Sequence, residues 1–154
     1  GSEMCIRDRT VQTIGHDKIN QLRHTRFFKN IDGMKAHMDK HAEILRPKFE
    51  AVINEFDREL SGLEIGTWTR PVGGYFISFD ALDGCAKAIV AKCKEAGVVL
   101  TGAGATFPYG KDPKDSNIRI APSFPEPEEL EAAARIFVLC VKLVSIDKYL
   151  SEMN

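Results

Sequence analysis

Apolar residues recur every three or four positions between Gly33 and Leu60, which is the spacing that places side chains on one face of a helix. We therefore predict one amphipathic helix over this range, capped by Asp32 and followed by a stop at Ser61-Gly62. Pro47 lies inside the pattern, so we expect a kink or a break at the residue before it. The preceding segment DKINQLRHTRFF favours a short helix of its own. The apolar stripe consists of Met34, Met38, Leu45, Phe49, Val52, Ile53, Phe56 and Leu60.

Four segments later in the chain have the alternating or β-branched character of strands. EIGTWTRP and GGYFISFD predict two strands joined as a hairpin through Pro71 to Gly74. GVVLTG predicts a short buried strand, and the run around Arg119 in DSNIRIAPSF predicts the fourth, which Pro122 ends.

Two further helices complete the pattern. The first runs from Leu82 to Ala96, with Gly97 as its C-cap, and the second from Glu126 to Leu150, with proline and acidic residues in its first turn. Residues 102–114, rich in Gly, Pro and Asp, predict a loop. The order α-β-β-α-β-β-α predicts an α/β fold of two layers, in which a small sheet packs against helices.

Composition and charge narrow the class of protein. The chain has 154 residues, 44% hydrophobic and 28% charged, with a net charge of −1, which is typical of a globular domain and gives no reason to expect nucleic acid or an anionic membrane as partner. No apolar run approaches the length of a membrane span. The cysteines, Cys5, Cys85, Cys93 and Cys140, lack metal-ligand spacing, so we expect a reducing cytoplasm and no metal site. Cys85 and Cys93 lie two helical turns apart, which favours core packing.

Arg119 is the most informative charged residue. A guanidinium on a strand of buried character is costly unless an anion pairs with it. The pattern leaves two alternatives open: a bound ligand, or a structural carboxylate such as Glu55 or Asp80.

Other candidate sites are weaker. His37 and His41, four residues apart on a helix, can face one metal, but no third ligand is near and a solvated or boundary face is favoured. TGAGATFPYG lacks the lysine and hydroxyl residue of a phosphate loop and leads into a strand, so we interpret it as a turn-rich loop that lets backbone approach a ligand. GGYF, at residues 73–76, favours a tight turn followed by core aromatics.

The first nine residues, GSEMCIRDR, fit neither a helix nor a strand pattern. They resemble the translation of a transposase-type sequencing adapter, the alternative being an ordinary polar tail. We therefore exclude residues 1–9 from the fold, and infer that the coding read began inside a longer gene.

Five segments of the chain are informative when taken together: TIGHDKINQLRHTRFFKN, MDKHAEILRPKFEAV, RPVGGYFISFDALDG, AGATFPYGKDP and NIRIAPSFP. In this order they resemble the C-terminal part of a fold type I, class I/II aminotransferase, a pyridoxal 5′-phosphate (PLP) enzyme, in a bacterial aspartate-aminotransferase-like subgroup. The resemblance implies that residues 10–30 are a remnant of the segment that links from the large PLP domain. It also implies that residues 31–154 form the small C-terminal domain, with its long helix at the N-terminal side.

The same resemblance implies roles for four residues. Arg119 matches the arginine that binds the α-carboxylate of the substrate, and Tyr75 or Phe76 matches an aromatic residue lining the substrate side of the site. Arg23 matches a stretch near the active site of the dimer partner, where it would contact a substrate side-chain carboxylate. The implied reaction is amino-group transfer between an amino acid, with aspartate as one candidate, and a 2-oxo acid, in a homodimer.

The Schiff-base lysine of this family lies upstream of the first matching segment, and none of the lysines here, Lys18 and Lys29 included, has its context. The aspartate that pairs with the pyridine nitrogen and the phosphate-binding loop belong to the large domain. We therefore expect no catalytic or cofactor-binding residue in this chain, PLP only in the full-length parent, and no activity of the 154-residue chain alone. The alternatives are a stand-alone amino-acid-binding regulatory module and the aminotransferase-like half of a transcription regulator.

Overall fold

The computed structural model describes residues 16–153, and its chain divides into two compact units, with the boundary between His41 and Ala42. The adapter-like segment, residues 1–9, lies outside the described residues. Among the described residues, no helix is both long enough and apolar enough to cross a membrane.

The first unit holds helix α2 (Lys18–Phe28) and the start of helix α3 (Ile31–Leu60). Asp17 caps α2, because its Oδ1 atom accepts a hydrogen bond from the N–H of Asn20 at 2.9 Å. This helix was expected from the sequence. The predicted cap of α3, Asp32, is wrong: Asn30 caps the helix through its Oδ1 atom, which accepts from the N–H of Gly33 at 2.8 Å. Asp32 lies in the first turn instead, where its charge faces the positive end of the helix dipole.

Helix α3 continues through Pro47 without a break. A kink or a break was predicted there, and the prediction of a break is wrong. The helix ends at Leu60, and Gly62 follows with φ +79°, a left-handed conformation that glycine adopts without strain. The predicted stop is confirmed.

The second unit contains a three-stranded antiparallel sheet in the order β1-β2-β3. Its strands are β1 (Gly66–Trp68), β2 (Ile77–Ala81) and β3 (Asn117–Ile120). The predicted pairing of the first two strands is confirmed, with Trp68 opposite Phe79. In the second pairing, Ser78 of β2 lies opposite Arg119 of β3.

The strand predicted from GVVLTG is wrong, since residues 98–100 belong to no strand of the described chain. The backbone at the start of this segment helps to end helix α4 (Ala86–Glu95) instead. The N–H of Val98 donates to the carbonyl of Cys93 at 2.8 Å, and the N–H of Gly97 donates to the carbonyl of Lys94 at 3.1 Å. The β-branched run in the sequence therefore did not lead to sheet pairing.

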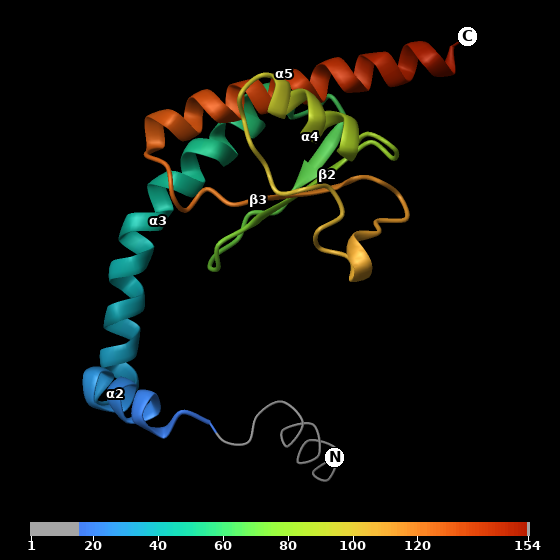
Figure 1. The fold of residues 1–154 in the computed structure, drawn as a ribbon. Coiled ribbons are helices and arrows are strands. Elements are labelled where there is room, and N and C mark those ends of the chain that lie inside the picture. Colours follow the sequence, from blue (N-terminus) through green and yellow to red (C-terminus); the bar gives the residue numbers. More distant parts are fainter. Residues whose placement is uncertain (1–15, 154) are drawn as a thin grey trace. The chain divides into compact units, whose positions relative to one another are not determined.

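The core lies on one face of the sheet, where α3, α4 and α5 (Pro127–Glu152) pack (Figure 1). Three aromatic rings join the layers: Phe56 of α3, Phe79 of β2 and Phe137 of α5 have centroids 5.0–5.5 Å apart. The predicted two-layer α/β arrangement is confirmed, with one strand fewer. Cys85 and Cys93 are buried, as expected for core packing.

Candidate functional site

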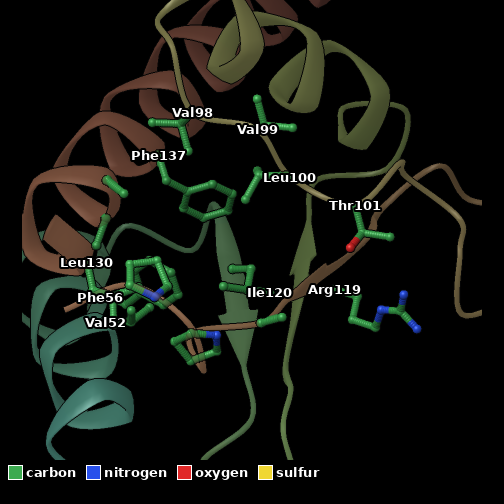
Figure 2. Close-up of a pocket in the computed structure, with 15 residues that line it drawn as sticks. Val52, Phe56, Val98, Val99, Leu100, Thr101, Arg119, Ile120, Leu130 and Phe137 are labelled. Carbon is green, nitrogen blue, oxygen red and sulfur yellow. The ribbon is translucent and has the colours of Figure 1, made fainter. Parts of the chain in front are cut away.

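The site is centred on Arg119, which the alternation of β3 places on the face of the sheet away from the core. Its neighbours Ile118 and Ile120 are buried among the helices, while Arg119 is only partly buried. Figure 2 shows the Arg119 side chain pointing away from Phe56 and Phe137. The guanidinium is therefore presented on the polar face of the domain.

Within the described residues, Arg119 has no carboxylate in ion-pair distance, and its Nε atom is buried without a hydrogen-bond partner. Its close contact is the Phe76 ring, whose centroid lies 4.6 Å from the guanidinium carbon, Cζ. A cation held by an aromatic face and without an anion of its own is a ready receptor for a carboxylate.

Neither of the structural partners considered for Arg119 pairs with it. Glu55 is buried and pairs with Arg58 at 2.6 Å and with Arg135 at 3.9 Å. Asp80 accepts a hydrogen bond from the side-chain amide of Asn117 at 2.8 Å. The structural alternative with these two carboxylates is wrong.

Sequence reasoning missed Asn117, two residues before Arg119 on the same face. Its Nδ2 atom donates to Ser78 Oγ and to Asp80 Oδ1, both at 2.8 Å, and its Oδ1 atom accepts from Thr106 Oγ1 at 2.6 Å. The signal in the sequence was the polar residue at the second position before the arginine, which period-two alternation places beside it. Its partners lie 11 to 39 residues away, so no local pattern identifies them.

The loop of residues 101–116 is built tightly onto the start of β3. Gly104 has φ +78°, and a Cβ atom there would lie 2.8 Å from the carbonyl oxygen of Gly110, so only glycine fits this close turn. The Asp112 carboxylate accepts from the N–H groups of Lys114, Ser116 and Asn117. The hydrogen bonds from these backbone N–H groups lower the pKa of Asp112. The loop leads into strand β3, as expected, and the Asp112 carboxylate holds the backbone N–H groups at the end of the loop and the start of the strand.

An apolar cavity of about 170 Å³ lies between the helices and the segments on either side of β3. Figure 2 shows the side chains that line it. Because the guanidinium of Arg119 points out of this cavity, we assign it no ligand. Its lining includes Val52, Phe56, Leu100, Ile120, Leu130 and Phe137.

The other candidate residues named from the sequence are the aromatic pair before β2, the arginine of α2 and two histidines of α3. Tyr75 and Phe76 are 55% and 47% exposed, so the interpretation as core aromatics is wrong, and Phe76 is in contact with Arg119. Arg23 is exposed on α2, in the first unit. His37 and His41 have ring centroids 4.6 Å apart, and the described residues contain no group of three potential metal ligands around them.

The described residues do not fit PLP by themselves. Lys48 is the buried lysine of the core, and its Nζ atom donates to the carbonyl oxygens of Ser123 and Phe124, at 3.5 and 3.1 Å. These hydrogen bonds connect the ammonium group of Lys48 to the segment that follows β3. No phosphate-binding turn at a helix N-terminus accompanies it in the described part of the chain, so we derive no step through the cofactor from these residues.

Comparison with solved structures identifies the class. The chain superposes on an aspartate transaminase from Corynebacterium glutamicum with a TM-score of 0.84 and 43% identity, covering 92% of this chain and 34% of that one. It also matches an α-aminoadipate aminotransferase from Thermus thermophilus with a TM-score of 0.63 and 20% identity, covering 74% of this chain and 28% of that one, a likeness of fold alone. The fold is that of the small domain of fold type I aminotransferases.

The family model described as aspartate amino-transferase matches residues 5–153. The chain therefore belongs to the aspartate aminotransferase family and corresponds to the C-terminal part of such enzymes, as the resemblance of its segments indicated. A curated relative, the aspartate aminotransferase of Corynebacterium glutamicum, is 44% identical over 139 residues, or 90% of this chain. The chain spans about a third of the length of the curated relatives it matches.

Proposed function

We propose that this chain supplies the substrate-carboxylate-binding part of a PLP-dependent aminotransferase. The enzyme would transfer an amino group between an amino acid, with aspartate as one candidate, and a 2-oxo acid. The observation that carries the proposal is Arg119, a guanidinium without a carboxylate partner in the described chain, stacked on the exposed Phe76 ring. The aminotransferases among its relatives support the reaction class.

In this proposal, Arg119 binds the α-carboxylate of the substrate through two parallel N–H···O hydrogen bonds. The planar fork fixes the orientation of the amino acid as well as its charge, which a lysine ammonium cannot do. Orientation contributes to rate because the amino acid must be held in the geometry in which it reacts. Bound in the full-length enzyme, PLP would supply the electron sink for the reaction.

The other proposed roles follow the family resemblance. Phe76 and Tyr75 line the substrate side of the site, and the exposure of both side chains and the contact of Phe76 with Arg119 support this. Arg23 is proposed to contact a substrate side-chain carboxylate across the interface of a homodimer. The 154-residue chain is proposed to be inactive alone, since none of its lysines has the sequence context of the family's Schiff-base lysine.

A chimera tests the proposal, in which this chain replaces the matched third of the Corynebacterium glutamicum aspartate aminotransferase. We expect transamination of aspartate, and we expect Arg119→Lys to raise KM for amino acids and to lower kcat/KM. Arg135→Lys, on the exposed side of α5, is the matched control and should leave both constants unchanged. Unchanged kinetics of Arg119→Lys would remove Arg119 from the carboxylate role, and transamination by the isolated chain would contradict its inactivity.

A further inference from the structure

We infer that Asn117 is a positioning residue for Arg119, because its amide fixes β3 between strand β2 and the loop of residues 101–116. This inference rests on the proposed carboxylate-binding role of Arg119. It assigns to Asn117 no contact with the substrate.

Every hydrogen-bonding group of Asn117 has a partner. Its backbone N–H donates to Asp112 Oδ2 at 2.8 Å, and its carbonyl accepts from the N–H of Gly104 at 3.4 Å. Its side chain uses both amide protons and its oxygen, for Ser78, Asp80 and Thr106. Asn117 is only 8% exposed, and all of its side-chain donors and its acceptor are bonded. Another residue type at this position would leave at least one of these buried partners without its hydrogen bond. Aspartate lacks the two donors, and serine is too short to reach all three partners.

The side-chain amide of Asn117 donates two hydrogen bonds to strand β2, and the register of the strands relates both acceptors to Arg119. Asp80 lies directly opposite Asn117, whereas Ser78 lies directly opposite Arg119. The amide of Asn117 therefore ties its own cross-strand partner and that of Arg119 into one unit. A change in the register or twist of β3 would have to break both bonds.

Arg119 has no comparable restraint of its own. Its guanidinium contacts the Phe76 ring, and its Nε atom has no hydrogen-bond partner in the described chain. The direction in which the guanidinium points is thus set by the backbone of β3 and by the ring. The hydrogen bonds that hold this backbone on the polar face converge on Asn117, so its loss should misplace the fork that binds the carboxylate.

The experiment is a double-mutant cycle in the chimeric holoenzyme described above. Asn117→Asp keeps the shape and the acceptor for Thr106, and replaces the two donors with an oxygen that faces Asp80. We expect it to raise KM for the amino acid by roughly tenfold and also to lower kcat, because a misplaced fork orients the bound amino acid wrongly as well as binding it less tightly. In the Arg119→Ala background the same substitution should change KM by less than about twofold, because the group being positioned is absent.

Two more variants keep the test decisive. Thr106→Val removes only the bond to Asn117 Oδ1, so if Asn117→Asp fails to fold, this variant carries the cycle, with a smaller rise in KM that again vanishes in the Arg119→Ala background. Thr67→Val, opposite Asp80 on β1, is the matched control and should leave KM unchanged.

The outcomes separate the two proposals. A rise in KM that is equally large with and without Arg119 would overturn the positioning role and leave the function of Arg119 intact. An unchanged KM in Asn117→Asp, where Arg119→Ala does raise it, would overturn it as well. If Arg119→Ala itself leaves KM unchanged, the carboxylate-binding role fails, and the inference about Asn117 falls with it.

Discussion

The guanidinium carbon of Arg119 lies 4.6 Å from the centroid of the Phe76 ring, on the face of the sheet opposite the core. The ring covers one side of the cation and remains 47% exposed itself. An aromatic face favours a cation electrostatically without neutralising it, so the guanidinium keeps its full charge for a carboxylate. Phe76 thus holds Arg119 without competing for the ligand.

Replacing Phe76 should weaken substrate binding. We expect Phe76→Leu in the chimeric enzyme to raise KM for amino acids by roughly three- to tenfold, because the leucine side chain lacks the ring quadrupole that holds the cation. Phe76→Trp should retain a KM near that of the unchanged chain. Phe124→Leu, at an aromatic residue that is 92% exposed and keeps its backbone bond to Lys48, is the control for loss of an aromatic side chain. A KM for Phe76→Leu equal to that of this control would refute the contact's role.

The sequence predicted the fold where one periodic signal extended over many residues. In α3, Phe49, Val52, Phe56 and Leu60 are buried as the stripe requires. The same stripe also included Met34, which is 42% exposed, because periodicity identifies a face but not how far along the helix the core extends. The strand predicted at residues 97–102 failed for a related reason: β-branched composition cannot tell which backbone groups are already used to end a helix.

The candidate site was predicted in part. The sequence predicted a strand around Arg119 and left a ligand and a structural carboxylate as alternatives for its partner. The fold was needed to show which face Arg119 occupies and that it has no carboxylate partner within the described chain. Asn117 was missed because its side-chain bonds to Ser78 and Asp80 span 39 and 37 residues. Contacts of that kind follow from register, and register depends on the whole sheet.

Gly66 should tolerate no larger residue. A Cβ atom at this position would lie 2.5 Å from Cζ of Phe79, whose ring is fixed between Phe56 and Phe137. We expect Gly66→Ala to lower the free energy of unfolding of the chain by about 1–3 kcal/mol, the usual cost of overpacking, measured by urea denaturation. Gly73→Ala, where nothing lies within 4 Å, should change it by less than about 0.5 kcal/mol.

The close contact between Gly66 and Phe79 also predicts how substitutions at the two positions combine. Phe79→Leu should be destabilising alone, since it leaves a cavity. The shorter side chain also makes room for the methyl group that Gly66→Ala introduces, so the double variant should be more stable than the sum of the two single effects. Strict additivity would show that the backbone, and not the ring, relieves the contact.

The buried thiols should be inert in the folded chain. Burial, together with the neighbouring Cys140, raises the pKa of Cys93 to about 12, and burial also raises the pKa of Cys85. The thiolate is the reactive form, so at a pH of about 8 we expect Cys93 to be alkylated by iodoacetamide far more slowly in the native chain than in urea. Cys5→Ser confines the labelling to cysteines of the described part, and mass spectrometry of the peptides gives each rate. Equal rates at Cys93 in both states would contradict its burial.

Asp112 should make the stability of the domain sensitive to acid. Backbone N–H groups, first that of Asn117, lower the pKa of its carboxyl in the folded state. A carboxyl whose folded pKa is depressed contributes stability above its unfolded pKa of about 3.9, and this contribution is lost as the pH falls through the folded value. We therefore expect the urea midpoint to fall at acid pH, and Asp112→Asn to reduce that fall and to lower the midpoint at neutral pH, because an amide accepts fewer backbone bonds. Asp147→Asn, exposed on α5, is the matched control and should follow the unchanged chain at every pH.

The same substitution also connects the loop to the site. Because Asp112 and Asn117 share a hydrogen bond, an Asp112→Asn chimera should show a raised KM for the amino acid at neutral pH. The rise should be smaller than that of Asn117→Asp, since the side-chain bonds of Asn117 to Ser78 and Asp80 remain. An unaltered KM together with a lowered urea midpoint would limit Asp112 to holding the loop.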